Sequence, residues 1–239
     1  MSQTALSRRL RGEIQEKPDA LTAFKVSRRW FMDGRKLDMG ELAETLGVSR
    51  ATLFRWVGNR DQLVSEICMD LCAKTFQRAW EDNAGAAGAE RVAAVVGAFV
   101  NYLAGAGYYC DFIRAEPERG LRIATTKAFP IQRLVIAEVE RLLGNELGDP
   151  GGAPAQLSHH DLAFLIVRIA ESVLYTDVIT GEPPKPEIAE QAVRALIGSQ
   201  AVLAGARSGQ DNKRRATGTQ NHAGSASGAV RSGRSSRAN

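Results

Sequence analysis

Apolar residues recur every three or four positions along most of the chain, which is the pattern of amphipathic helices. In the first half, this spacing predicts helices over about 18–33, 39–46, 50–57, 60–82 and 89–104. In the second half, it predicts helices over about 108–115, 117–126, 127–147, 158–180 and 186–203. No segment shows a convincing strand pattern, so the sequence predicts an all-α fold.

One stretch, DMGELAETLGVSRATLFRWVGNRD at 38–61, predicts two short helices joined by a sharp turn and followed by a third helix. Asp38, Ser49 and Asn59 each stand just before a helix, where a short polar side chain accepts a hydrogen bond from the first turn. Gly47 lies between the two short helices, and glycine tolerates the positive φ that such a turn often needs. These signals define three helix starts within about twenty residues.

The spacing of this stretch is that of a helix-turn-helix. Its predicted core consists of apolar and small residues, namely Leu42, Ala43, Leu46, Gly47, Val48, Leu53 and Val57. The second helix then presents its N-terminal end to the major groove of DNA. There Arg50 and Arg55 can hold guanine with paired hydrogen bonds, and Ala51 or Thr52 can contact a thymine methyl group. An ordinary αα-hairpin would pack in the same way, but the three N-caps and the basic first helix favour DNA binding.

Charge is distributed unevenly along the chain. Residues 1–36 carry a net charge of +5 and residues 206–239 one of +6, whereas residues 61–205 carry −7. This asymmetry indicates a polyanionic partner at the ends and a different role for the middle. The alternative is that the charged ends only keep the protein soluble.

We therefore expect four parts. They are a flexible basic arm at 1–17, a DNA-binding domain at 18–62, a helical ligand-binding and dimerisation domain at 63–205, and a disordered tail at 206–239. The tail is rich in Gly, Ser and Arg and has too few apolar residues to fold. It either adds phosphate contacts or is a solvated extension.

The sequence offers no set of residues typical of an enzyme, a cofactor site or a metal site. His159 and His160 are adjacent in one helical turn, so their side chains diverge, and neither a Gly-rich phosphate loop nor an HExxH motif is present. Cys68 and Cys72 share a helix face without further ligands, which favours two buried thiols. The absence of a signal peptide and of a long apolar run predicts a cytoplasmic protein with no membrane partner.

The stretch LDMGELAETLGVSRATLFRWVGNRDQLV resembles the DNA-binding domain of the TetR family of bacterial transcriptional regulators. The positions that fit the family pattern are Leu42, Ala43, Gly47, Val48, Ser49, Thr52, Leu53, Val57 and Leu63. Phe54 replaces the usual Tyr and lacks the hydroxyl that often meets a phosphate. Trp56 stands where His or Tyr is common, and its indole N–H can donate to a phosphate or its ring can pack. Arg60 replaces the usual Lys, and the resemblance implies that it contacts a phosphate.

The resemblance also implies a mechanism. The family's long fourth helix joins the DNA-binding domain to a helical effector domain, whose last two long helices form a four-helix bundle with a second subunit. Here those helices are 158–180 and 186–203, although two apolar helices can equally close a monomeric core. The chain is then a homodimeric repressor that a small molecule releases from a pseudo-palindromic operator. The alternative is an activator, or another helix-turn-helix protein without a small-molecule effector.

Two further segments, AEPERGLRIATT and IVRIAESVLYTDVITGEPP, are similar to TetR-family regulators of the QsdR type, which are linked to the degradation of quorum-sensing lactones. A lactone-like or acyl effector would suit an apolar pocket. The candidate lining consists of aromatic and charged residues of the middle domain, namely Tyr102, Tyr108, Phe112, Phe129, Arg133, Phe164, Arg168, Glu171 and Tyr175. The alternative is that the aromatics are core residues and that Arg168 pairs with Glu171 three positions on.

Overall fold

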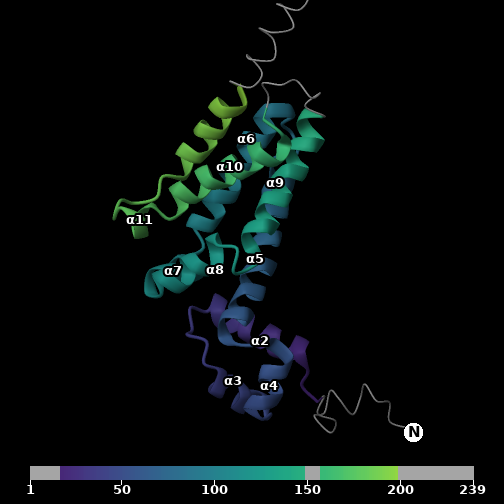
Figure 1. Ribbon diagram of the computed structural model, residues 1–239, viewed down its shortest axis with the longest axis vertical. Helices are drawn as coiled ribbons and strands as arrows, with labels where there is room; N and C mark the ends of the chain where they lie inside the picture. The colour runs from purple at the N-terminus through teal and green to yellow at the C-terminus, as the bar shows by residue number, and fades with distance from the viewer. Residues whose placement is uncertain (1–16, 149–156, 199–239) are drawn as a thin grey trace, which may run out of the picture.

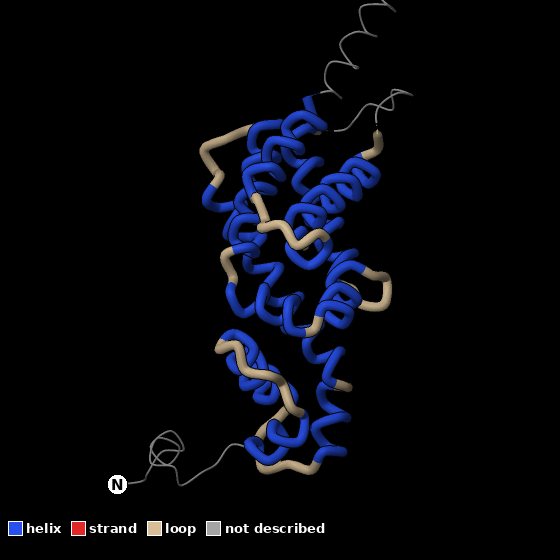
Figure 2. The backbone as a smooth tube through the Cα atoms, turned by 90° about the vertical axis from the view of Figure 1, so that its left-hand side faces the viewer, coloured by secondary structure: helices blue, strands red, loops and turns tan. Residues whose placement is uncertain are grey.

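The computed structural model describes residues 17–148 and 157–198 (Figure 1). Every regular element in these two ranges is a helix (Figure 2), which confirms the all-α prediction. The predicted tail, and all of the predicted arm except Lys17, lie outside the described residues.

Three short helices form a small unit at one end of the molecule, which we call the head (20–57). They are α2 (Ala20–Met32), α3 (Met39–Leu46) and α4 (Arg50–Val57). The predicted N-caps are confirmed: Asp38 accepts from the backbone N–H groups of residues 40 and 41, and Ser49 accepts from that of residue 52. Asn59 caps the next helix through a complete capping box with Gln62.

The long helix α5 (Arg60–Asp82) connects the head to the rest of the chain (Figure 1). Its first half supplies Leu63, Val64 and Ile67 to the core of the head. Its second half supplies Phe76 and Ala79 to a separate core. One helix therefore belongs to both hydrophobic cores and joins them mechanically.

The remaining helices form a larger bundle, which we call the body (88–148 and 157–198). They are α6 (Gly88–Ala104), α7 (Gly107–Ala115), α8 (Pro117–Thr125), α9 (Ile131–Leu147), α10 (His159–Leu174), α11 (Thr176–Ile179) and a helical segment at 186–198. α10 packs along α9 and α6 around a core that contains Val95, Leu142 and Ile166, each 0% exposed. Among the described residues no single helix is long and apolar enough to cross a membrane, and only α6 and α7 together, bent by 66°, pass that test.

Two predicted helices differ from the observed ones. The helix expected over 127–147 begins at Ile131, because Pro130 cannot donate a backbone hydrogen bond and its ring disfavours a preceding helical turn. The helix expected over 158–180 ends at Leu174, and the short α11 follows after Tyr175. The buried Tyr175 hydroxyl lies 2.7 Å from that of Tyr109 on α7, and this interaction accompanies the break.

Candidate nucleic-acid interface

The turn between α3 and α4 is built around Gly47. This residue has φ 64° and ψ 32°, in the left-handed region that glycine adopts at little cost. Its N–H and that of Val48 donate to carbonyl groups at the end of α3, including Ala43 O at 3.0 Å from Val48 N. The turn therefore ends α3 and aims α4 in a new direction.

The inner side of the helix pair is buried as the sequence predicts. Leu42 and Leu53 are 0% exposed and Ala43 is 2% exposed. Leu46, Val48 and Val57 are half-buried and pack against the same cluster. Burial of this side leaves the other side of α4 facing outward.

The outer side of α4 holds most of the predicted DNA-binding residues. Ser49, Arg50, Ala51, Phe54 and Arg55 are exposed, whereas Thr52 and Trp56 are half-buried. The guanidinium groups of Arg50 and Arg55 form no hydrogen bond or ion pair with another described residue. Two exposed arginines with free donors on one short helix are suited to an anionic or guanine-containing ligand.

Arg50 is seated against the first turn of α3. A Cβ atom placed on the buried Gly40 would lie 2.5 Å from Arg50 Nη2 and 3.1 Å from its Cζ. Glycine at position 40 thus leaves the space that the guanidinium occupies beside Asp38. The carboxylate of Asp38 caps α3, and the backbone N–H groups of Glu41 and Gly40 lower its pKa. No sequence pattern indicated this contact, because a helical glycine is usually only destabilising.

Arg60 does not lie with the other predicted DNA-binding residues. Its Nη1 and Nη2 donate to both carboxylate oxygens of Glu116, at 2.8 and 2.5 Å, and its Nε donates to Leu37 O at 2.9 Å. The side chain is only 19% exposed. Three of the five N–H donors of the guanidinium therefore have partners within the chain, and the phosphate contact of Arg60 stays a prediction. A carboxylate 56 positions away in the sequence could not be assigned to Arg60 from spacing.

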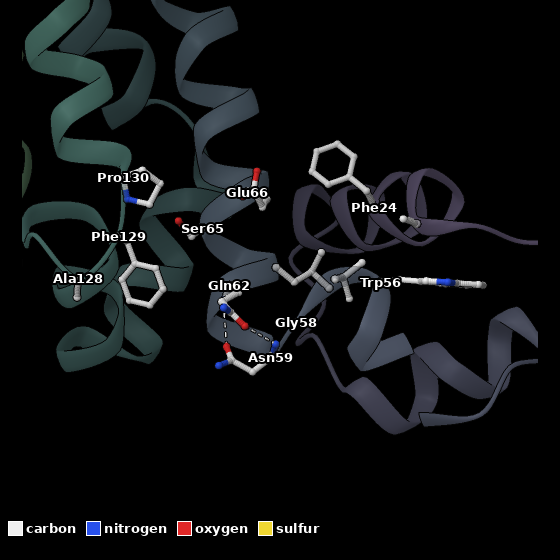
Figure 3. A pocket seen from close by; sticks show the side chains of 13 residues that line it. Phe24, Trp56, Gly58, Asn59, Gln62, Ser65, Glu66, Ala128, Phe129 and Pro130 are labelled. Atoms are coloured by element: carbon white, nitrogen blue, oxygen red, sulfur yellow. Dashed lines mark hydrogen bonds between the residues drawn. The ribbon is translucent and has the colours of Figure 1, made fainter. Parts of the chain in front are cut away.

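A cleft of about 680 Å³ separates the head from the body on one side of α5 (Figure 3). Phe24 and Trp56 lie on the head side, and Phe129 and Pro130 on the body side. The capping box of Asn59 with Gln62 lies at its base. Trp56 borders this cleft on the head side, and its ring points away from Phe129 (Figure 3).

The predicted effector-pocket residues lie in several parts of the structure. Tyr108 and Phe112 contact the head through Phe31, with ring centroids 5.9 and 5.5 Å apart. Phe129 and Arg133 border a surface cleft of about 600 Å³ beside α9. Others lie elsewhere: the hydroxyl of Tyr102 donates to Asp82 at 2.6 Å, and Phe164 is 46% exposed.

Three of the predicted residues do lie close together inside the body. Arg168 forms an ion pair with Glu171, as the i,i+3 alternative expected. Gln132 of α9 donates to the same carboxylate at 2.9 Å, and the buried Tyr175 follows one turn later on the chain. Burial raises the pKa of Glu171 to about 7 against the opposing effect of Arg168. This group is a partly buried polar cluster within the body.

The cysteines give no sign of a metal site. Cys68 and Cys72 are buried, and burial raises the pKa of each thiol to about 12, so both remain protonated. In residues 17–148 and 157–198, no three His, Cys, Asp or Glu side chains are grouped to hold a metal ion.

Comparisons with known proteins agree with this geometry. Residues 87–198 match the family model for a tetracyclin repressor-like C-terminal domain. No curated protein matches the sequence significantly.

Among solved structures, the R. erythropolis transcriptional repressor QsdR from the TetR family is 27% identical. It has a TM-score of 0.66, and the match covers 75% of this chain and 94% of that chain. The TetR-family regulator PfmR from Thermus thermophilus is 18% identical over 73% of this chain and 93% of that chain, with a TM-score of only 0.33. The C-terminal match, the likeness to QsdR and the helix-turn-helix together make this chain similar to the DNA-binding transcriptional regulators of the TetR family.

Proposed function

We propose that this chain is a homodimeric repressor that a small molecule releases from a pseudo-palindromic operator. The observation that carries the proposal is the exposed side of α4, where Arg50 and Arg55 form no hydrogen bond or ion pair with the described residues. The proposed DNA-binding face also contains Ser49, Ala51, Thr52, Phe54 and Trp56. Repression is favoured over activation because the similar QsdR is described as a repressor.

In vitro transcription tests the sign of regulation. A DNA site is first selected from a random library with the full chain and then placed over a promoter. We expect the protein to reduce transcript yield from this template and not from one with a scrambled site. Increased yield would favour the activator alternative.

A homodimer is supported by exposed apolar side chains on the last two long helices. Phe164 and Leu165 of α10 are 46% and 38% exposed, and Ile188 in the 186–198 helix is 45% exposed. Large exposed apolar side chains on such helices support a subunit interface. We expect Phe164→Asp to give a monomer in light scattering, whereas Ile179→Asp, at a 63% exposed residue of α11, serves as the matched control. If the parent protein is monomeric and still protects a two-fold DNA site, the proposed homodimer is wrong.

An effector with a hydrogen-bond acceptor is supported by Arg168. Its Nη2 contacts Glu171, but its Nε is buried and makes no hydrogen bond, which is costly unless a ligand supplies an acceptor. A lactone or acyl carbonyl is such an acceptor. We expect an acyl lactone to dissociate the protein from its selected site, and Arg168→Gln to raise the required concentration about tenfold. If a panel of acyl lactones leaves the complex intact, the proposed effector class is wrong.

A further inference from the structure

We infer that an ion-pair junction between α5 and α8 fixes the orientation of the head on the body and thereby sets the spacing of the two DNA-binding helices in a dimer. The junction consists of Arg60, Asp61, Glu116, Arg119 and Arg122. Its residues are positioning residues and do not contact DNA. This inference rests on the proposed binding of a dimer to a two-fold operator.

Arg60 ties three parts of the chain together. It is the first residue of α5, directly after the helix that carries Arg50 and Arg55. Its Nε donates to Leu37 O in the loop before α3, and its Nη1 and Nη2 donate to the two carboxylate oxygens of Glu116. A paired contact of this kind restricts rotation as well as distance. Arg60 therefore holds both sides of the helix-turn-helix relative to the start of α8.

A second set of ion pairs, made by Asp61, also joins α5 to α8. Asp61 accepts from Arg119 Nε at 2.9 Å and from Arg122, both on α8. Arg119 also donates to Glu116, so the two contacts share one arginine. Arg60 and Asp61 of α5 are thus bound to Glu116, directly before α8, and to two arginines of α8. Rotation of α5 would have to break several charged contacts together.

The junction lies beside two openings between the head and the body. Gln62 and Ser65 line the cleft of about 680 Å³ on one face of α5 (Figure 3). Arg60 and Val64 line a second cavity, of about 260 Å³, on the opposite helix face. Apolar contacts, including that of Phe31 with Phe112, also join the head and the body, but apolar contacts have little directionality. The charged contacts supply the direction that the apolar ones lack.

Partial burial makes the junction persistent. The side chains of Arg60, Asp61 and Glu116 are 19%, 17% and 21% exposed. Hydrogen bonds from Arg60 and Arg119 hold the pKa of Glu116 at about 2, so its carboxylate stays charged across the physiological range. Salt screens such half-buried pairs less than exposed ones.

The test compares full-length Arg60→Gln, Glu116→Gln and the double variant with the parent protein. The DNA is the site selected with the parent, together with versions whose half-sites are moved apart or together by one and two base pairs. Asp177→Asn is the matched control, because its 2.7 Å ion pair with Arg114 lies wholly within the body. Circular dichroism and light scattering first verify that each variant folds and assembles like the parent. Asp61→Asn provides a second variant if Glu116→Gln fails this check.

The junction predicts that both single variants lose about 3- to 30-fold in affinity for the parent's spacing and discriminate less between spacings. The double variant should lose no more than either single variant, because both break one contact. The dependence of affinity on salt should stay the same, since no phosphate contact is removed.

A direct phosphate contact from Arg60 predicts opposite results. Arg60→Gln would then lower the salt slope by about 0.9 and weaken binding to all DNA, while Glu116→Gln would free Arg60 and strengthen binding. Either result, or an unchanged spacing preference in both single variants, would overturn the inference. A parent protein that selects no site at all would instead refute the proposed function on which the inference rests.

Discussion

Replacing Glu171 with Gln tests how the polar interior of the body sets the pH dependence of stability. Glu171 lies on α10 and meets Gln132 of α9, and its side chain is only 16% exposed. Gln132 donates to its carboxyl group, and an amide oxygen at the same position can accept this hydrogen bond. The substitution therefore removes the ionisable proton while keeping the size and one contact.

The direction of the pKa change determines whether the free energy of unfolding rises or falls with pH. Burial raises the pKa of Glu171 from 4.5 to about 7, so between these values the folded protein keeps a proton that the unfolded chain has released. The free energy of unfolding should consequently fall as pH rises through this window and level off above it. The difference between the two pKa values corresponds to a loss of about 3 kcal/mol.

Urea denaturation of the parent and of Glu171→Gln, measured between about pH 4 and pH 8 by circular dichroism, provides the assay. Other groups titrate alike in both proteins, so the difference between the two profiles isolates Glu171. Between about pH 4 and pH 8, we expect the free energy of unfolding of Glu171→Gln to rise by about 3 kcal/mol relative to that of the parent. Parallel profiles would mean that Glu171 is ionised throughout, with Arg168 outweighing the effect of burial.

Three further substitutions probe stability, each by urea denaturation. Leu53→Ala should cost about 2–5 kcal/mol, because this side chain is 0% exposed, and a smaller loss would show that the head is loosely packed. Ser49→Ala should cost about 1 kcal/mol through loss of the cap on residue 52, and an unchanged stability would contradict that role. Tyr175→Phe should cost about 1–2 kcal/mol by leaving the Tyr109 hydroxyl without its partner. The double Tyr109→Phe/Tyr175→Phe variant should cost less than the sum of the single variants, and additive losses would rule out the pair.

The head is largely predictable from sequence because its signals are local. Asp38, Ser49 and Asn59 cap helices within three residues of themselves, and Gly47 satisfies a backbone requirement at its own position. Leu53 stands at one of the regularly spaced apolar positions of its helix and is buried, as that spacing predicts. Each of these inferences needs only the neighbouring residues.

The unpredicted features depend on partners distant in the sequence. Glu116 meets Arg60 across 56 positions, and Tyr175 meets Tyr109 across 66. Neither pairing leaves a periodic pattern, so the sequence alone assigns Arg60 to a phosphate and continues the helix through Tyr175. The aromatic residues expected in a single pocket are dispersed for the same reason, because composition does not specify which helix faces meet.

Fluorescence anisotropy of the full chain on its own upstream DNA, compared with Arg50→Ala, tests most directly whether α3 and α4 recognise a specific sequence. We expect the parent to prefer one segment strongly over random DNA. Arg50→Ala should reduce that preference about 10- to 100-fold while largely preserving binding to random DNA. If Arg50→Ala lowers affinity for all DNA equally, Arg50 contacts only the backbone. If Arg50→Ala retains the full preference of the parent, the exposed side of α4 does not read the sequence, and its proposed role in recognition is contradicted.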